Sequence, residues 1–416
     1  MLRENRIIYT SFLDWRFKIK KAEGNFLWDE KGKKYLDFTS GWNTISLGWN
    51  NPEIAGAIKD QLKKNVQSPM WTSTQIQESY AELLTSKLPK SLKAIGRTTG
   101  GMESNLEAMK LARVYTERMK VFGFIESWHG QLIENMALSY LPEWMPHLSN
   151  KRDDLLHLPY PQTYRTHKSE KELLSELEIK LENILCNKDV AAVITESGIL
   201  TGWGSAYLAP KGFLTLLRKL TKKYGTLLIL DEVGSGFSRL GKLFAMEIEN
   251  VTPDIVTFAK GITNGVLPMG AMVTTEDIAG AFKEANLQST FGWLPLSCAA
   301  AQKTLEIHLR DKIWEKAEKD GEYTMKVLKN ELSDQPFVGD IRGKGMLIAI
   351  DFVVDKKTKE KNTSLVEKVV QKCWEKGLHI VCNHENVIQL MPPLIIKRNA
   401  LDRGIQILVE VVKTNR

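Results

Sequence analysis

Through the middle of the chain, short and mostly apolar segments alternate with amphipathic ones. The apolar segments have the length and β-branched content of buried strands, and they cover residues 121–125, 191–195, 226–230, 255–259 and 271–274. Between two of them, residues 210–225 begin with proline, keep leucines on one face and end with glycine, which is typical of a helix. This alternation predicts an α/β fold, with a mostly parallel sheet covered by helices on both faces.

The two ends of the chain have a different pattern. Residues 24–28 and 34–38 resemble short strands, and the turn at 29–32 between them predicts a hairpin. Helices are expected from Pro52 onwards and over 74–88 and 297–310, and residues 311–416 predict an α+β unit. The strands expected in that unit are 346–352, 379–381 and 387–391, and its expected helices are 311–331, 364–376 and 399–413.

Three charged residues stand where expected strands end. Glu196 and Asp231 each close an apolar run, and Lys260 follows a third. Because ligands of parallel sheets bind at the carboxyl ends of the strands, we expect these three side chains to share one crevice. A lysine amine can form a Schiff base with the aldehyde of pyridoxal phosphate (PLP), and a carboxylate can keep the pyridine nitrogen of its ring protonated.

Two further motifs suit a phosphorylated aromatic cofactor, although each has an ordinary structural explanation. Residues 98–105 form a glycine-containing turn before an expected helix at 103–119, and helix N-terminal amides bind phosphate. A simple loop has the same composition. Trp128-His129-Gly130 follows an expected strand, so the indole ring can stack on a cofactor or pack in the core.

The adjacent carboxylates Asp231 and Glu232 allow a different interpretation, a Mg²⁺ site like that of a nucleotidase. The sequence contains no G-x-x-x-x-G-K-[ST] loop to hold a nucleotide phosphate. We therefore expect no metal.

Composition restricts the class of partner. The net charge of +7 is spread over 416 residues, with basic residues mostly accompanied by acidic ones, so no nucleic-acid partner is expected. No apolar run approaches the length of a membrane span, and no signal peptide is expected at the N-terminus. The four cysteines form no C-x-x-C pair, which favours neither a disulfide framework nor a zinc site and indicates a cytoplasmic location.

The sequence resembles the class III aminotransferases, which are fold type I PLP enzymes, over nearly its whole length. The most specific match is Leu228-Ile-Leu-Asp-Glu-Val-Gly-Ser-Gly-Phe-Ser-Arg-Leu-Gly241, followed by Val251-Thr-Pro-Asp-Ile-Val-Thr-Phe-Ala-Lys-Gly261. The resemblance implies a large domain with a seven-stranded sheet between helices, and a smaller α+β domain formed by both termini. We assign residues 1–65 and 311–416 to the small domain and 66–310 to the large, PLP-binding domain.

The resemblance also implies roles for single residues. Lys260 would be the Schiff-base lysine and proton shuttle, and Asp231 would pair with the pyridine nitrogen. Thr290 would reach the phosphate of a neighbouring subunit, which implies a homodimer or larger assembly with active sites at the interface. The remaining cofactor contacts implied by the resemblance involve the ring, the phosphate and the substrate side of the cofactor, and they fall on Val233, Trp128, His129, Gly101, Met102 and Glu196.

Three positions depart from the family pattern. Gln131 and Gln389 stand where many members have arginines, and glutamine cannot replace the charged fork with which arginine binds a carboxylate. Gly234 stands where some members have a glutamine that contacts the ring hydroxyl. We therefore expect an atypical donor, such as a terminal amine, and we name Trp42, Trp71, Gln131 and Gln389 as candidate substrate residues.

The predicted function is an aminotransferase that moves an amino group from an amine or amino-acid donor to an oxo acid by a ping-pong mechanism. An amino-acid racemase, epimerase or aminomutase on the same fold remains an alternative, because the motifs do not separate these activities. A PLP-binding protein without turnover is a third possibility.

Overall fold

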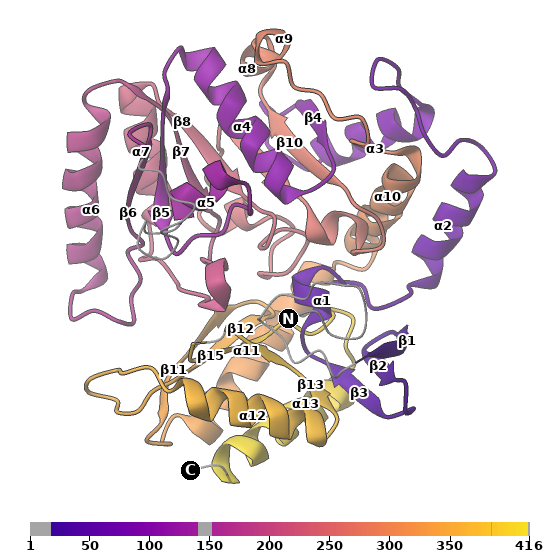
Figure 1. Ribbon diagram of the computed structural model, residues 1–416, viewed down its shortest axis with the longest axis vertical. Coiled ribbons are helices and arrows are strands. Elements are labelled where there is room, and N and C mark those ends of the chain that lie inside the picture. The colour runs from indigo at the N-terminus through magenta and orange to yellow at the C-terminus, as the bar shows by residue number, and fades with distance from the viewer. Residues whose placement is uncertain (1–17, 140–151, 384, 415–416) are drawn as a thin grey trace.

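The computed structural model describes residues 18–139, 152–383 and 385–414. The large sheet and its helices occupy one end of the molecule and the smaller sheets the other, and the ends of the described chain both lie in the smaller part (Figure 1). Among the described residues, no helix is long and apolar enough to cross a membrane.

The large sheet has seven strands in the order β4-β10-β9-β8-β7-β5-β6. From β9 to β6 all neighbours are parallel, whereas β10 runs antiparallel to both of its neighbours. The strands are β4 (Ala94–Thr98), β5 (Lys120–Ile125), β6 (Leu155–Pro159), β7 (Val190–Glu196), β8 (Leu227–Asp231), β9 (Ile255–Phe258) and β10 (Gly270–Thr274).

Helices pack on both faces of this sheet because its strands are apolar on both sides. On β8, Leu228 and Leu230 join one core cluster and Ile229 joins the other. The helices of the first face are α3 (Gln75–Thr85), α6 (Glu170–Leu185), α7 (Phe213–Tyr224) and α10 (Pro295–Arg310). Those of the second are α4 (Gly101–Thr116), α5 (Ile133–Ser139), α8 (Glu276–Ala279) and α9 (Phe282–Ala285).

The smaller part contains two four-stranded sheets and a separate apolar core. One sheet consists of β1 (Ile19–Glu23), β2 (Phe26–Asp29), β3 (Lys34–Asp37) and β13 (Leu378–His379), and the other of β11 (Val338–Lys344), β12 (Leu347–Phe352), β15 (Val387–Leu390) and β14 (Val381–Cys382). Its helices are α1 (Ser40–Asn43), α2 (Pro52–Leu62), α11 (Ile313–Leu332), α12 (Thr363–Glu375) and α13 (Arg398–Thr414). The parallel pairing of β13 with β3 joins the two ends of the chain.

The predicted fold class is confirmed, and the N-terminal hairpin forms as β2 and β3. The strand expected at 379–381 was wrong, because the chain leaves one sheet after His379 and enters the other at Val381. The helix expected at 103–119 begins two residues earlier, at Gly101, and ends at Thr116. The domain limits at residues 65 and 310 stay a prediction, which the separate apolar cores support.

Candidate active site

Three charged side chains meet at the carboxyl edge of the large sheet. Glu196 ends β7 and Asp231 ends β8, and the two residues are partners in the parallel ladder. Lys260 begins a short 3-10 turn just after β9, with a left-handed φ of 46°. For a residue other than glycine this backbone conformation is uncommon, and it is found where a site over-determines the chain.

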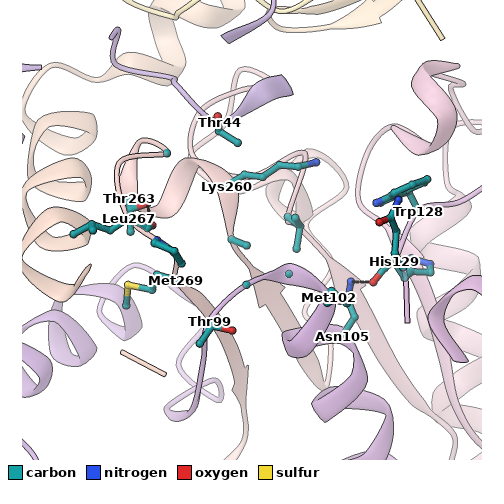
Figure 2. Close-up of a pocket in the computed structure, with 18 of the residues that line it drawn as sticks. Thr44, Thr99, Met102, Asn105, Trp128, His129, Lys260, Thr263, Leu267 and Met269 are labelled. Atoms are coloured by element: carbon teal, nitrogen blue, oxygen red, sulfur yellow. Dashed lines mark hydrogen bonds between the residues drawn. The ribbon is translucent and has the colours of Figure 1, made fainter. Parts of the chain in front are cut away.

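A cavity of about 630 Å³ opens at this edge. The Lys260 side chain extends across it towards Trp128, while Leu267 and Met269 lie on the other side (Figure 2). Seven of the residues predicted from the sequence line it, namely Gly101, Met102, Trp128, His129, Gln131, Val233 and Lys260.

The N-terminus of α4 opens into this cavity. Gly100 is the N-cap, no side chain caps the helix, and Gly100, Gly101 and Met102 all line the cavity. Uncapped amides at the start of a 16-residue helix attract an anion such as phosphate. Gly101 leaves room for Val233, since a Cβ there would lie 2.7 and 2.8 Å from its two methyl groups and would displace them.

Asp231 is 2% exposed and held by three donors. Its Oδ1 accepts the Val233 backbone N–H at 2.9 Å, and its Oδ2 accepts the Asn105 side-chain amide at 2.7 Å. His129 Nδ1 lies 2.8 Å from the same Oδ2, and because an ionised carboxylate only accepts, this nitrogen carries the proton. A carboxylate has about four acceptor positions, so Asp231 retains room for one more donor.

Glu196 is buried beneath the wall of the cavity. Its Oε1 accepts the backbone N–H groups of Trp128 and Gly202 at 3.0 and 3.2 Å, and its Oε2 accepts the backbone N–H of Thr201 at 2.8 Å and the Thr201 hydroxyl. Burial and the nearby charge of Asp231 raise the pKa of Glu196. Glu196 therefore fixes the Trp128 backbone, and its side chain does not line the cavity.

Lys260 is the charged group best suited to covalent chemistry. Burial lowers its pKa, although the negative charges of Glu196 and Asp231 act in the opposite direction. A lowered pKa increases the fraction of neutral amine, which is the form that attacks an aldehyde and accepts a proton.

Glu232 does not join Asp231 in a metal site. Its carboxylate accepts the backbone N–H groups of Ala245 and Met246 at 2.7 and 2.6 Å, so it holds a neighbouring loop. Within the described residues, no group of three potential ligands could hold a metal ion. Because backbone donors occupy Glu232, the adjacent carboxylates Asp231 and Glu232 do not face one ligand together.

Glu196 and Asp231 lie behind the cavity wall, and four further candidate residues lie outside the cavity in the single chain. Trp42 is 43% exposed, Trp71 is 82% exposed and lines a second cavity, Thr290 lies in the loop before α10, and Gln389 is buried in β15. Their roles in binding substrate or a partner's phosphate stay predictions.

Two groups of lining residues had no predicted role. The segment 265–269 returns from Lys260 to β10 and forms one wall, together with Thr44 and Thr263. In the sequence, this wall was indicated only by the position of the segment directly after Lys260. Asn105 also lines the cavity, and only its contact with Asp231, 126 positions away, reveals its importance.

This arrangement fits PLP by its shape and by its chemistry. Because Gly101 has no Cβ, the Val233 side chain has room at the cavity wall. The start of α4 presents backbone amides that can bind a phosphate, and Asp231 can accept one more hydrogen bond. Lys260 supplies the amine. The structure also explains one departure from the family pattern: a Cβ at Gly234 would lie 2.9 Å from the Thr201 hydroxyl, so glutamine does not fit there.

Comparisons with known proteins identify the family of this chain. The family description of the class III aminotransferases matches residues 11–412. An acetylornithine aminotransferase of Methanopyrus kandleri is 31% identical over 394 residues, 95% of this chain and 94% of the relative. A leucine/methionine racemase of Thermococcus litoralis is 30% identical and covers 92% of this chain and 88% of its own.

Solved structures give the same result. An (S)-enantioselective omega-transaminase from Thermomicrobium roseum superposes with a TM-score of 0.90 at 31% identity, covering 96% of this chain and 92% of its own. The chain therefore belongs to the class III aminotransferase family and is a PLP-dependent enzyme that transfers an amino group from a donor amine to an oxo-acid acceptor.

Proposed function

We propose that Lys260 and Asp231 carry the chemistry of a ping-pong transamination. Bound PLP supplies the aldehyde that exchanges amino groups and a ring that withdraws electrons. Lys260, as a neutral amine, would accept a proton from the amine-bearing carbon of the donor and return it to the C4′ carbon of the cofactor. Asp231 would hold the ring nitrogen protonated. The supporting observation is that Lys260 lines one cavity with the start of α4, and that Asp231 lies behind its wall, bonded to the lining residues Asn105 and His129.

We further propose that the donor is a primary amine whose reacting end carries no carboxylate. The supporting observation is that Lys260 is the only lysine or arginine among the described residues that line the cavity. Gln131 lines it in a position where many family members have arginine. A carboxylate bound beside the reacting amine would lack the bidentate partner that arginine provides.

A panel of donors tests this proposal. The purified enzyme is mixed in turn with a neutral arylalkylamine, a diamine, an ω-amino acid, N-acetylornithine and glutamate, and the loss of the cofactor absorbance band is timed. We expect a donor without a carboxylate near the reacting amine to convert the cofactor fastest, and an oxo acid to restore the band. Fastest conversion by glutamate, whose reacting amine lies beside a carboxylate, would refute the donor assignment.

A racemase is the second candidate, because a leucine/methionine racemase is among the relatives. A racemase needs no oxo acid and does not convert the cofactor to its amine form. Loss of optical activity of a single amino acid, with a persistent absorbance band and no oxo-acid product, would favour it.

We propose a homodimer in the cytoplasm. Trp71 and Phe291 are 82% and 60% exposed, and a cavity of about 790 Å³ lies beside Trp71 and Ser289. Exposed aromatic side chains beside a cavity are typical of a subunit interface. Light scattering on the purified protein would give its molar mass, and the mass of a monomer would refute the dimer.

The buried, free thiols of Cys298 and Cys373 support the proposed cytoplasmic location, because that compartment is reducing.

A further inference from the structure

Asn105 connects the cavity to the buried carboxylate behind it. The residue is 1% exposed and lies on α4, one turn after the glycines that begin this helix. Its Nδ2 donates to Asp231 Oδ2 at 2.7 Å and to the His129 backbone oxygen at 3.1 Å. Figure 2 shows the second of these bonds, from Asn105 to the His129 backbone oxygen.

Thr257 fixes the orientation of the Asn105 amide. Its hydroxyl donates to Asn105 Oδ1 at 2.6 Å, from the strand next to that of Asp231. If the amide turned over, its oxygen would face the Asp231 carboxylate, and two acceptors would meet. The hydroxyl and the carboxylate together select the orientation in which Asn105 donates to Asp231.

We propose that Asn105 is a positioning residue for the amino-transfer reaction and acts through Asp231. A donated hydrogen bond favours the charged form of a carboxylate, so it reduces the tendency of Asp231 to take the proton of the pyridine nitrogen. The bond also prevents rotation of the carboxylate and so keeps its remaining acceptor positions available. This inference rests on the proposed pairing of Asp231 with the ring nitrogen.

The chain provides a matched control in Asn135. Its side-chain amide donates to the same His129 backbone oxygen, at 2.9 Å, and it is also fully buried. It makes no contact with Asp231 among the hydrogen bonds of the described residues. Removal of either asparagine leaves the His129 oxygen with one donor, but only the loss of Asn105 changes the carboxylate.

The test compares wild type, Asn105→Ala, Asn135→Ala and Thr257→Val with PLP labelled with ¹⁵N in the ring. The first readout is the dissociation constant of PLP, measured by titration of the cofactor-free protein. The second is the ¹⁵N chemical shift of the pyridine nitrogen, which reports its protonation. We expect Asn105→Ala to bind PLP about 10- to 100-fold more weakly, from the loss of one hydrogen bond to a charged group.

The ¹⁵N shift of Asn105→Ala should also move towards the unprotonated value, whereas Asn135→Ala should match wild type in that shift. Thr257→Val should move both readouts in the same direction as Asn105→Ala, by less. This variant decides the question if Asn105→Ala does not fold. A shift and an affinity equal to those of Asn135→Ala would overturn the inference. Failure of the wild type to bind PLP or to protonate its nitrogen would instead refute the proposed function.

Discussion

Replacement of Gly101 by alanine tests whether the start of α4 and Val233 together shape the cofactor cavity. The new Cβ would lie 2.7 and 2.8 Å from the two Val233 methyl groups, where ordinary contact begins near 3.4 Å. In the cofactor-free enzyme the Val233 side chain can turn into the cavity. A cofactor ring packed against Val233, as the family resemblance implies, would block that movement, so the conflict should appear mainly as a loss of affinity.

The size of the effect follows from the overlap. Overpacking of a closed site costs about 1–3 kcal/mol, which corresponds to a roughly 5- to 150-fold weaker affinity for PLP. Alanine is the better helix former, so the cofactor-free protein should keep its thermal stability. An effect on binding without an effect on folding is therefore the expected pattern.

Gly56 is the matched control for this change. It lies inside α2, does not line the cavity, and a Cβ there would meet nothing within 4 Å. The affinity of Gly56→Ala for PLP should stay near that of wild type. In the double variant Gly101→Ala/Val233→Ala the methyl groups that collide are gone, so the Gly101→Ala penalty should shrink.

The assay is titration of the cofactor-free variants with PLP, followed by absorbance, with thermal unfolding measured in parallel. Equal PLP affinities of Gly101→Ala and Gly56→Ala would refute the predicted conflict with Val233. An unchanged penalty of Gly101→Ala when Val233 is alanine would also refute it.

Four further changes have expected outcomes. Gln131→Arg should increase the relative rate of cofactor conversion by glutamate, measured against a neutral amine, because it restores a carboxylate partner in the cavity. Burial lowers the pKa of His308 to about 3, so as the pH falls below 6.5 the unfolded state binds a proton that the folded state does not. In urea unfolding at pH 5, the free energy of unfolding of wild type should be about 2 kcal/mol lower than at neutral pH, whereas His308→Gln should not show this loss. Burial raises the pKa of Glu232 to about 8, so its contribution to stability is lost as the pH rises through 8. Between pH 7 and 9 the free energy of unfolding of wild type should fall by about 1 kcal/mol more than that of Glu232→Gln. Equal losses in the two proteins would contradict this. Gly202→Ala would place a Cβ 1.9 Å from the Glu126 backbone oxygen and should destabilise the protein by about 3 kcal/mol, visible as a lower thermal midpoint or a loss of folded protein.

Five of the seven strands of the large sheet were predicted because their signals are local. The edge strands β4 and β6, which are only partly buried, were missed. A strand buried on both faces must be apolar along its length, so each of the five expected strands was recognised within one or two residues of its true limits. The positions of Glu196, Asp231 and Lys260 at strand ends followed directly. Short strands were harder: β13 and β14 have two residues each, and periodicity cannot show that they belong to different sheets.

The sequence by itself determined the fold class, the family and the lysine and aspartate of the site, since these depend on patterns within short segments and on fixed residues at fixed separations. Only the tertiary structure decided which side chains surround them. The bond between Asn105 and Asp231 joins residues 126 positions apart, and the wall formed by residues 265–269 depends on how the chain returns to β10. Contacts of this kind are set by the packing of α4 against the sheet, and no local pattern in the chain encodes that distance.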